Sequence, residues 1–339
     1  MTNTNKIIQV KKITRKKLQS SKLVLDFSGK DINEAVTNTL IRVAIDHIPT
    51  YAFNKDAITI EKNTSIYMNN HVVGIIENIT IPDIDCSIVM LPSIYWKDIK
   101  YTYDVGDRLR HKEDTHNIEM SINVTNETNN NLLITTNDMK MYDNGKEIKN
   151  GYDRSYPHEI LKLRPQEKFI CKASAVLGIG KRNNKWTSTA NSYHNVYENK
   201  TGDKINKIRL FISSIGQNDE YTILVKACRF IKIKLEEIKH LVEENFYSLG
   251  PKGPKKKYYE LILNDEDHTI GNILNNKLQD HKDITYSGLN KHDRLVNKIV
   301  IKFISTNNNP IKPLYETIDN IIKLYTSIEH KLIKLGSSK

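Results

Sequence analysis

The sequence predicts an α+β fold in which two related halves of one chain pair as an intramolecular pseudo-dimer, with a mainly β domain inserted in the first half. Three observations predict it. A short β-like run followed by an amphipathic helix with an acidic start occurs twice, at 23–45 and 259–274. Apolar residues recur at helical spacing in two long stripes, at 223–241 and 314–332. Short β-type runs and turn clusters fill the region from 51 to 203.

The composition limits the classes of protein to which the chain can belong. Its 339 residues are enough for roughly two or three compact units, and no apolar run reaches the length of about 18 residues that predicts a membrane span. Three widely spaced cysteines form no C-x-x-C pair, so we expect a reducing compartment and no cysteine-based zinc site. The net charge of +11 favours contact with polyanions or an acidic partner, and simple solvated charge explains it equally well.

The first half begins with a predicted basic tail at 1–17, followed at 18–50 by the first part of a dimerisation domain. Residues 23–27 form the predicted strand. Asp31 and Glu34 then predict an acidic variant of the capping box at the start of a helix, and Pro49 ends that helix.

An inserted, mainly β domain is predicted at 51–203. Its β-type runs alternate with turn clusters such as Asp143-Asn-Gly145. The predicted runs are 58–60, 72–76, 79–81, 118–124, 132–136 and 169–176.

The dimerisation domain resumes at 204–247, where the long apolar stripe predicts a helix from about 220 to 246. Two Pro-Lys steps, two glycines and four lysines predict a linker at 248–257. The remaining residues, 258–339, have a β–α–β–β–α pattern, which predicts a second and smaller dimerisation domain. Pro310 and Pro313 lie at the start of its final helix, where proline is tolerated.

Two motifs could carry chemistry. The carboxylates and imidazole of residues 265–268 could bind a metal or transfer protons, but acids at a helix N-terminus more often cap the helix. The segment Gly178-Ile-Gly180-Lys181-Arg182 suggests a phosphate loop, yet it lacks the first glycine of the Walker pattern and has arginine where serine or threonine is required. We therefore interpret it as a basic loop that contacts a protein or nucleic acid, or as an ordinary surface loop.

Together the motifs resemble those of the RNA polymerase alpha-like subunits. Asn38-Thr-Leu40-Ile-Arg42, with Ile48-Pro49 after it, is similar to the N-x-L-R-R…I-P helix of the larger subunit, although Ile41 replaces its first arginine. The segment 178–186 resembles that subunit's G-x-G-K…A-K-W loop. Residues 266–274 match the E-D-H-T-L-G-N-L-L signature of the small partner subunit.

The order of these motifs, with the larger-subunit set first, then a linker, then the small-subunit set, resembles a fused subunit of nucleocytoplasmic large DNA viruses. In cells, the two halves resemble separate subunits that pair with each other: the archaeal D and L subunits, and the third and eleventh subunits of eukaryotic polymerases. The abundance of Asn, Ile and Lys fits a mimivirus-like genome best. The resemblance therefore implies an alpha-like dimerisation module in one polypeptide, rather than a homodimer.

The resemblance also implies which residues act in assembly. Those expected at the dimerisation surface are Asn38, Leu40, Arg42, Asp267, His268, Thr269, Gly271, Asn272 and Leu274. Those expected in a loop that contacts a large subunit are Gly178, Gly180, Lys181, Lys185 and Trp186. Arg42 is the candidate for a polar contact with a large subunit, because its guanidinium pairs well with carboxylates and carbonyls.

The function implied is that of a non-catalytic assembly platform in a DNA-directed RNA polymerase, which docks the two largest subunits and a small alpha-associated subunit for viral transcription. DNA would be contacted only through the complex. We expect no catalytic residue, metal, cofactor or membrane contact, and localisation in the virion and host cytoplasm. The alternatives are a stand-alone basic nucleic-acid-binding protein and, more remotely, a hydrolase or metalloenzyme that uses residues 265–268.

Overall fold

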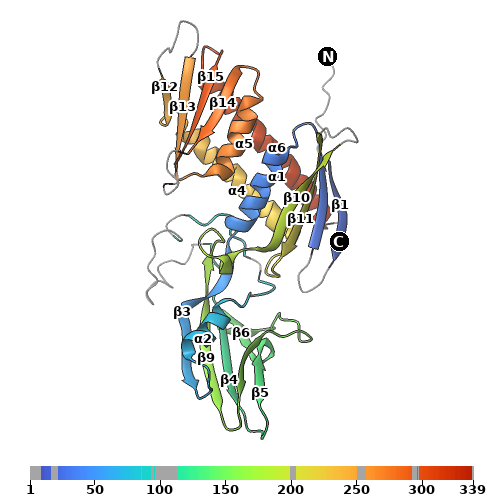
Figure 1. The fold of residues 1–339 in the computed structure, drawn as a ribbon, viewed down its shortest axis with the longest axis vertical. Helices are drawn as coiled ribbons and strands as arrows, with labels where there is room; N and C mark the ends of the chain where they lie inside the picture. The colour runs from blue at the N-terminus through green and yellow to red at the C-terminus, as the bar shows by residue number, and fades with distance from the viewer. Residues whose placement is uncertain are drawn as a thin grey trace.

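Two four-stranded antiparallel sheets lie on either side of a layer of four helices, and a separate β-rich insert extends from one end of this layer (Figure 1). This description rests on a computed structural model. The residues that it describes are 9–16, 22–84, 86–92, 95, 113–198, 204–249, 257–291, 296 and 298–337.

The first sheet has the strand order β1-β2-β11-β10. Its strands are β1 (Gln9–Lys16), β2 (Lys22–Ser28), β10 (Thr189–Glu198) and β11 (Lys204–Ser214). Alternate residues of β11 are apolar and buried, and β2 is buried from Leu23 to Phe27, with Leu23, Leu25 and Phe27 in the core on the face that packs on the helices. The second sheet has the order β12-β13-β15-β14. Its strands are β12 (Phe246–Leu249), β13 (Lys257–Asn264), β14 (Ile284–Asn290) and β15 (Lys298–Ser305).

The four helices repeat one connection scheme. In each half a helix follows the second strand, and a longer helix follows the strand that pairs with it at the centre of the sheet. These helices are α1 (Glu34–Asp46) and α4 (Glu220–Leu241) in the first half, and α5 (His268–Gln279) and α6 (Ile311–Ser337) in the second. One continuous hydrophobic core joins both sheets to all four helices, so neither half buries its helices alone.

The insert has a hydrophobic core of its own. Its main sheet has the order β3-β9-β4-β6-β7, and β5 pairs with β8. The elements are β3 (Thr50–Asn63), α2 (Asn69–Glu77), β4 (Ile118–Thr125), β5 (Leu132–Thr135), β6 (Lys140–Asp143), β7 (Lys146–Ile148), β8 (Glu159–Leu163) and β9 (Lys168–Gly178), with short 3-10 turns η2 (Thr136–Asp138) and η3 (Asn184–Trp186).

The α+β class is confirmed, but three boundaries differ from the sequence expectation. The basic tail expected at 1–17 contains β1, in which Val10 packs against the core beside β2. The insert expected at 51–203 loses β10, because that strand pairs with β11 in the first sheet. The linker expected at 248–257 loses its first two residues to β12; residues 250–256 lie outside the described part of the chain.

Two local predictions also differ. The run 72–76, expected to be a strand, lies in α2, where Val72 and Ile76 are buried one helical turn apart. A continuous apolar run fits either structure, so its periodicity alone could not decide. The N-cap of α1 is Asn33 rather than Asp31: the Asn33 side chain accepts a hydrogen bond from the Val36 N–H at 3.1 Å. Asparagine caps a helix as well as aspartate does.

Candidate assembly site

The seam between the halves includes an apolar contact between α1 and α5, beside the contact between α4 and α6. Leu40 and Leu274, the leucines expected there, are at most 1 % exposed. Burying two such side chains contributes roughly 3–6 kcal/mol relative to leaving them exposed, before the cost of ordering them. Both expected leucines therefore lie in the shared core.

Polar groups cross the seam at its edges. Asn33 donates to the Asn276 side chain at 2.8 Å, and the Lys277 ammonium donates to the Asp31 carbonyl at 2.9 Å. The Thr39 hydroxyl donates to the carbonyl of Thr269 at 3.1 Å. These bonds fix the register of the two helices. If the helices slid past each other, every one of these bonds would break and leave a partly or fully buried polar group unpaired.

Helix α6 ties the second half to the first. Its buried Tyr325 hydroxyl donates to the Val36 carbonyl in α1 at 3.0 Å. Its Glu329 carboxylate pairs with Arg229 at 2.6 Å and Lys232 at 2.5 Å, both in α4. Burial raises the pKa of Glu329, but these two cations outweigh it and hold the pKa below its usual range. The carboxylate is therefore ionised at neutral pH.

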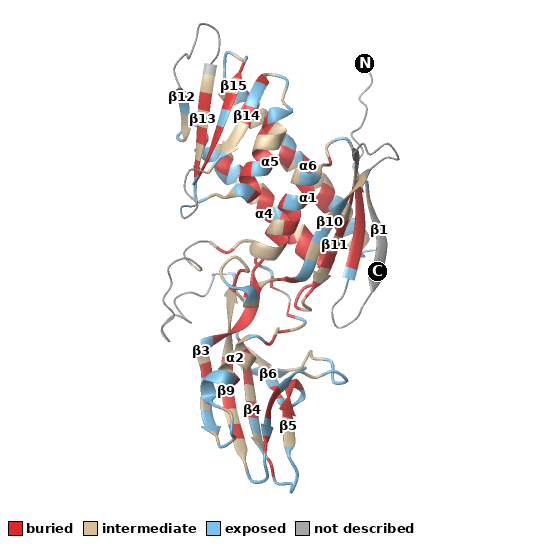
Figure 2. Cartoon of the chain, viewed as in Figure 1, coloured by how far each residue is buried: buried red, intermediate tan, exposed pale blue. Residues whose placement is uncertain are grey.

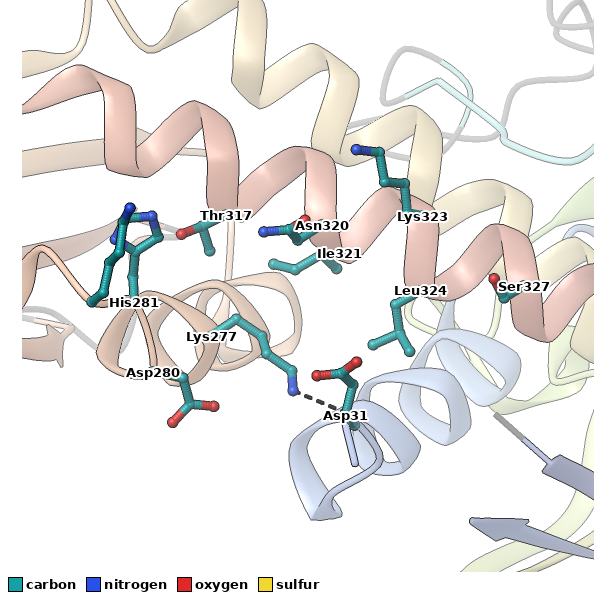
Figure 3. Close-up of a pocket in the computed structure, with 11 residues that line it drawn as sticks. Asp31, Lys277, Asp280, His281, Thr317, Asn320, Ile321, Lys323, Leu324 and Ser327 are labelled. Carbon is teal, nitrogen blue, oxygen red and sulfur yellow. Dashed lines mark hydrogen bonds between the residues drawn. The ribbon is translucent and has the colours of Figure 1, made fainter. Parts of the chain in front are cut away.

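A cavity of about 470 Å³ opens along the same seam (Figure 3). Asp31 lines it from the first half, and the end of α5 and one side of α6 line the rest. Figure 3 shows the Lys277 side chain crossing from α5 toward Asp31. The cavity walls mix acids, lysines and apolar groups, so no single ligand class is indicated.

Asp267, the last of the acidic residues before α5, caps that helix. The Asp267 carboxylate accepts from the Thr269 N–H at 2.8 Å and also pairs with the Lys181 ammonium at 2.8 Å. Burial raises the pKa of Asp267, yet the hydrogen bond and charge of Lys181 outweigh it and hold this pKa well below its usual range. Lys181 belongs to the loop expected to contact a large subunit, so two expected sites meet within the chain.

Residues 265–268 do not converge on one point. Glu266 pairs with Lys234 of α4 at 3.3 Å, Asp267 faces Lys181, and His268 is exposed. Among the described residues, no group of three or more His, Cys, Asp or Glu side chains is placed to hold a metal ion. This divergence favours the helix-capping interpretation.

We expect the two roles of Asp267 to separate by substitution. Asp267→Asn keeps an acceptor for the Thr269 N–H and removes the charge that faces the largely buried Lys181, so the free energy of unfolding should fall by about 1–3 kcal/mol. Asp267→Ala removes both contacts and should cost about 1–2 kcal/mol more. Urea unfolding measures both variants; equal losses would show that the cap contributes nothing.

The loop at 178–188 packs against the C-terminal end of α1. A Cβ on Gly178 would lie 2.5 Å from the Trp186 indole, and one on Gly180 would lie 2.2 Å from the carbonyl oxygen of Ile45. Both distances are far below van der Waals contact, so only glycine permits this approach. The two glycines of the predicted basic loop are therefore packing positions.

This loop satisfies the free carbonyls at the end of α1. The Ser188 hydroxyl donates to the carbonyl of Ala44 at 2.6 Å, the Thr187 hydroxyl to that of Ile45 at 3.3 Å, and the Lys181 N–H to that of Asp46 at 2.8 Å. The last carbonyls of a helix have no partner within it. The loop thus acts as a cap that joins the insert to the dimerisation module.

Lys185 and Trp186 are buried at this joint. The Trp186 indole N–H donates to the Val176 carbonyl at 2.8 Å, and its ring is 1 % exposed. The Lys185 ammonium pairs with Glu77 at 3.2 Å and lies 4.6 Å from the Trp186 ring centre. These two side chains therefore tie the insert to the module, and a contact of this loop with a large subunit stays a prediction.

The remaining expected residues divide between surface and core. Asn38, His268 and Asn272 are exposed, and Arg42 is partly exposed. Thr269 is buried, and a Cβ on Gly271 would lie 2.4 Å from the Ile299 side chain. Asn38 and Asn272, expected at the dimerisation surface, thus face solvent, and the asparagines bonded across the seam are Asn33 and Asn276.

His47 gives the joint a dependence on pH. Its ring stacks on Phe230 at 4.7 Å; burial and the nearby Lys181 charge lower its pKa to about 3. The folded state keeps His47 neutral while the unfolded chain protonates near pH 6.5. The contribution of neutral His47 to the free energy of unfolding is therefore fully present above pH 6.5. It is lost as the pH drops toward 3.

We expect the free energy of unfolding to be about 1–2 kcal/mol lower at pH 5 than at pH 7, because His47 binds a proton only in the unfolded chain. His47→Phe keeps a ring against Phe230 and removes the titration. Urea unfolding across this range should give a shallower pH dependence for the variant. Identical slopes for both proteins would contradict a neutral His47 in the folded state.

The role of several seam residues could not be predicted from the sequence. Thr39, Asn276 and Glu329 show no pattern that separates them from solvated polar positions on a helix. Tyr325 lies in the apolar stripe of the last helix, but its hydroxyl partner could not be predicted.

Within the described residues, no helix is long and apolar enough to cross a membrane.

Comparison with known proteins agrees with this arrangement. Residues 258–331 match the RNA polymerase Rpb3/Rpb11 dimerisation domain. These residues cover the second sheet from β13 onward, α5 and most of α6. The chain is also 27 % identical over 331 residues to a protein of Acanthamoeba polyphaga mimivirus that is provisionally named a DNA-directed RNA polymerase subunit; the match covers 91 % of this chain and 90 % of that protein.

Proposed function

Because residues 258–331 form an RNA polymerase Rpb3/Rpb11 dimerisation domain, we propose that the chain is a non-catalytic assembly platform of a DNA-directed RNA polymerase. Its first half acts as the built-in partner of that domain, so the chain is an intramolecular pseudo-dimer. The assembled module docks the largest and second-largest subunits and a small alpha-associated subunit. The similarity to a mimivirus protein supports viral transcription as the setting, in the virion and the host cytoplasm.

The single hydrophobic core shared by the two halves carries this proposal. A dimerisation domain must bury its helices against a partner, and α1 and α4 cover the helices of the matched segment. The equal strand order of the two sheets supports the same pairing. Fusion keeps the partner at an effective concentration on the order of millimolar. The seam is thus occupied from within, which leaves the outer surfaces for other subunits.

Co-expression with the second-largest RNA polymerase subunit from the same source tests the platform. A tagged chain should retain that subunit through affinity purification and gel filtration. Failure of the two to co-purify, with both proteins soluble, would refute docking.

Arg42 remains the proposed contact with a large subunit. Its side chain is partly exposed near the end of α1. We expect Arg42→Glu to weaken retention of the second-largest subunit about tenfold or more, because a guanidinium lost from an interface removes charged hydrogen bonds. Arg154→Glu, which makes the same charge change at an exposed position of the insert, should leave retention unchanged. Equal retention by both variants would contradict the role of Arg42.

The joint favours this proposal over the two alternatives. The loop that suggested nucleic-acid binding has Lys181 and Lys185 in ion pairs and Trp186 buried. The cluster that suggested catalysis caps α5. Asp267→Asn in the complete polymerase therefore serves as the check on catalysis: transcription should continue, and its loss in a well-folded variant would favour the enzyme alternative.

A further inference from the structure

The first sheet leaves one face without cover from any described helix. Figure 1 shows the helices against the other face only, where alternate residues of β11 and Leu23, Leu25 and Phe27 of β2 are buried. On the outer face of β2, Val24 and Asp26 are also buried. The outer face carries aromatic and basic side chains from three neighbouring strands. These residues are Lys22 on β2, Lys207, Arg209 and Phe211 on β11, and Tyr193 and Tyr197 on β10.

The aromatic rings form a stack that ends at the sheet edge. Tyr193 and Phe211 lie opposite each other on adjacent strands, with ring centres 4.5 Å apart and planes at 11°. The Lys22 ammonium lies 5.4 Å from the Phe211 ring centre. Since β10 is an edge strand, one face of the Tyr193 ring has no neighbouring strand beside it, and the residue is 40 % exposed. A further planar ring can extend this stack.

Cations lie one step along the same strands. Arg209 pairs with Asp26 at 2.8 Å and Lys207 pairs with the same carboxylate at 3.2 Å. Lys207 lies 4.4 Å and Arg209 5.2 Å from the Tyr197 ring centre. Among the described side chains of this face, Lys22, Lys207 and Arg209 are three cations and Asp26 is one carboxylate, so this part of the face has a positive charge.

We propose that the outer face of this sheet binds single-stranded nucleic acid, with a base stacked on Tyr193 and phosphates held by Lys22, Lys207 and Arg209. Stacking platforms beside basic side chains are the chemistry that holds unpaired bases and their backbone. An acidic protein surface would use the cations but not the open ring, so the aromatic stack decides between the two partners. The net charge of +11 adds long-range attraction for the polyanion.

The outer face of the second sheet offers a matched control. Tyr286 is 56 % exposed on the edge strand β14. On the neighbouring strands Lys302 is paired with Glu260 at 2.6 Å, so this cation is neutralised by a carboxylate. On β15 of this face, Lys298 and Lys302 stand against the Glu260 carboxylate, so the face has an exposed tyrosine with a smaller excess of described cations than the first sheet. A general effect of removing surface tyrosines would appear at both positions.

The test is fluorescence anisotropy of a labelled 12-nucleotide single-stranded RNA with the full chain, between 50 and 300 mM salt. Binding should weaken with salt, with a slope of log Kd on log salt of about 2 for three phosphate contacts. Tyr193→Ala should weaken binding about fivefold to a hundredfold, and Tyr193→Phe should retain it. Lys207→Gln should reduce the salt slope by about 0.7, while Arg209 still pairs with Asp26.

Tyr286→Ala should bind as the unchanged chain does. Absence of binding, or equal binding by Tyr193→Ala with its thermal unfolding unchanged, would overturn the proposal; the latter result would leave charge alone, and so an acidic protein surface, as the better partner. The assay needs no polymerase subunit. Failure here and failure of large-subunit docking are therefore separate results.

Discussion

Replacing Gly180 with alanine is expected to lower the free energy of unfolding by about 2–3 kcal/mol. The added Cβ would lie 2.2 Å from the carbonyl oxygen of Ile45, which is backbone and cannot turn aside. The loop must move away from α1, and the bond from the Lys181 N–H to the Asp46 carbonyl would lengthen or break. A single methyl group therefore removes both packing and a helix cap.

Urea unfolding followed by circular dichroism measures this change. Gly74→Ala is the matched control, because an added Cβ there meets no atom within 4 Å and the position lies in α2. That variant should be neutral or up to about 1 kcal/mol more stable. If Gly180→Ala were as stable as Gly74→Ala, the tight joint between loop and helix would be disproved.

Leu274→Ala is expected to cost about 2–5 kcal/mol, since it opens a cavity in the core that both halves share. Leu241→Ala makes the same chemical change at the last residue of α4, where the side chain is 44 % exposed. It should change the stability by less than about 0.5 kcal/mol. The contrast separates loss of packing at the seam from loss of a leucine as such.

Because both halves share one core, destabilising the second half with Leu274→Ala should also destabilise the first half. Trp186 lies at the joint of the first half with the insert, far in sequence from Leu274. In a Trp96→Phe background, its fluorescence should report a transition that Leu274→Ala shifts to lower urea. A Trp186 transition that does not move would mean that the halves unfold independently.

Periodicity predicted the elements whose burial is one-sided. The apolar stripes at 223–241 and 314–332 became α4 and α6, because a helix between two sheets needs one broad apolar face. The repeated strand and helix at the start of each half were predicted for the same reason. The strand–helix order of the 258–339 segment followed from these signals.

The sequence could not predict what depends on contacts between distant segments. β10 was assigned to the insert because its sequence shows a strand but not its partner, and only pairing with β11 places it in the first sheet. The loop at 178–188 contains glycines and cations, a composition that is typical of solvent-exposed loops. Its burial depends on the carbonyls at the end of α1 and on Asp267, which lies 86 residues away from Lys181 in sequence.

The most direct test of the platform divides the chain in two. Fragments 1–249 and 257–339 are co-expressed with the second-largest RNA polymerase subunit, and a tag on the smaller fragment is used for purification. We expect the tag to recover the larger fragment and the polymerase subunit together in equal amounts, because both fragments build the docking module. Recovery of neither protein, or of the polymerase subunit without the larger fragment, would contradict it.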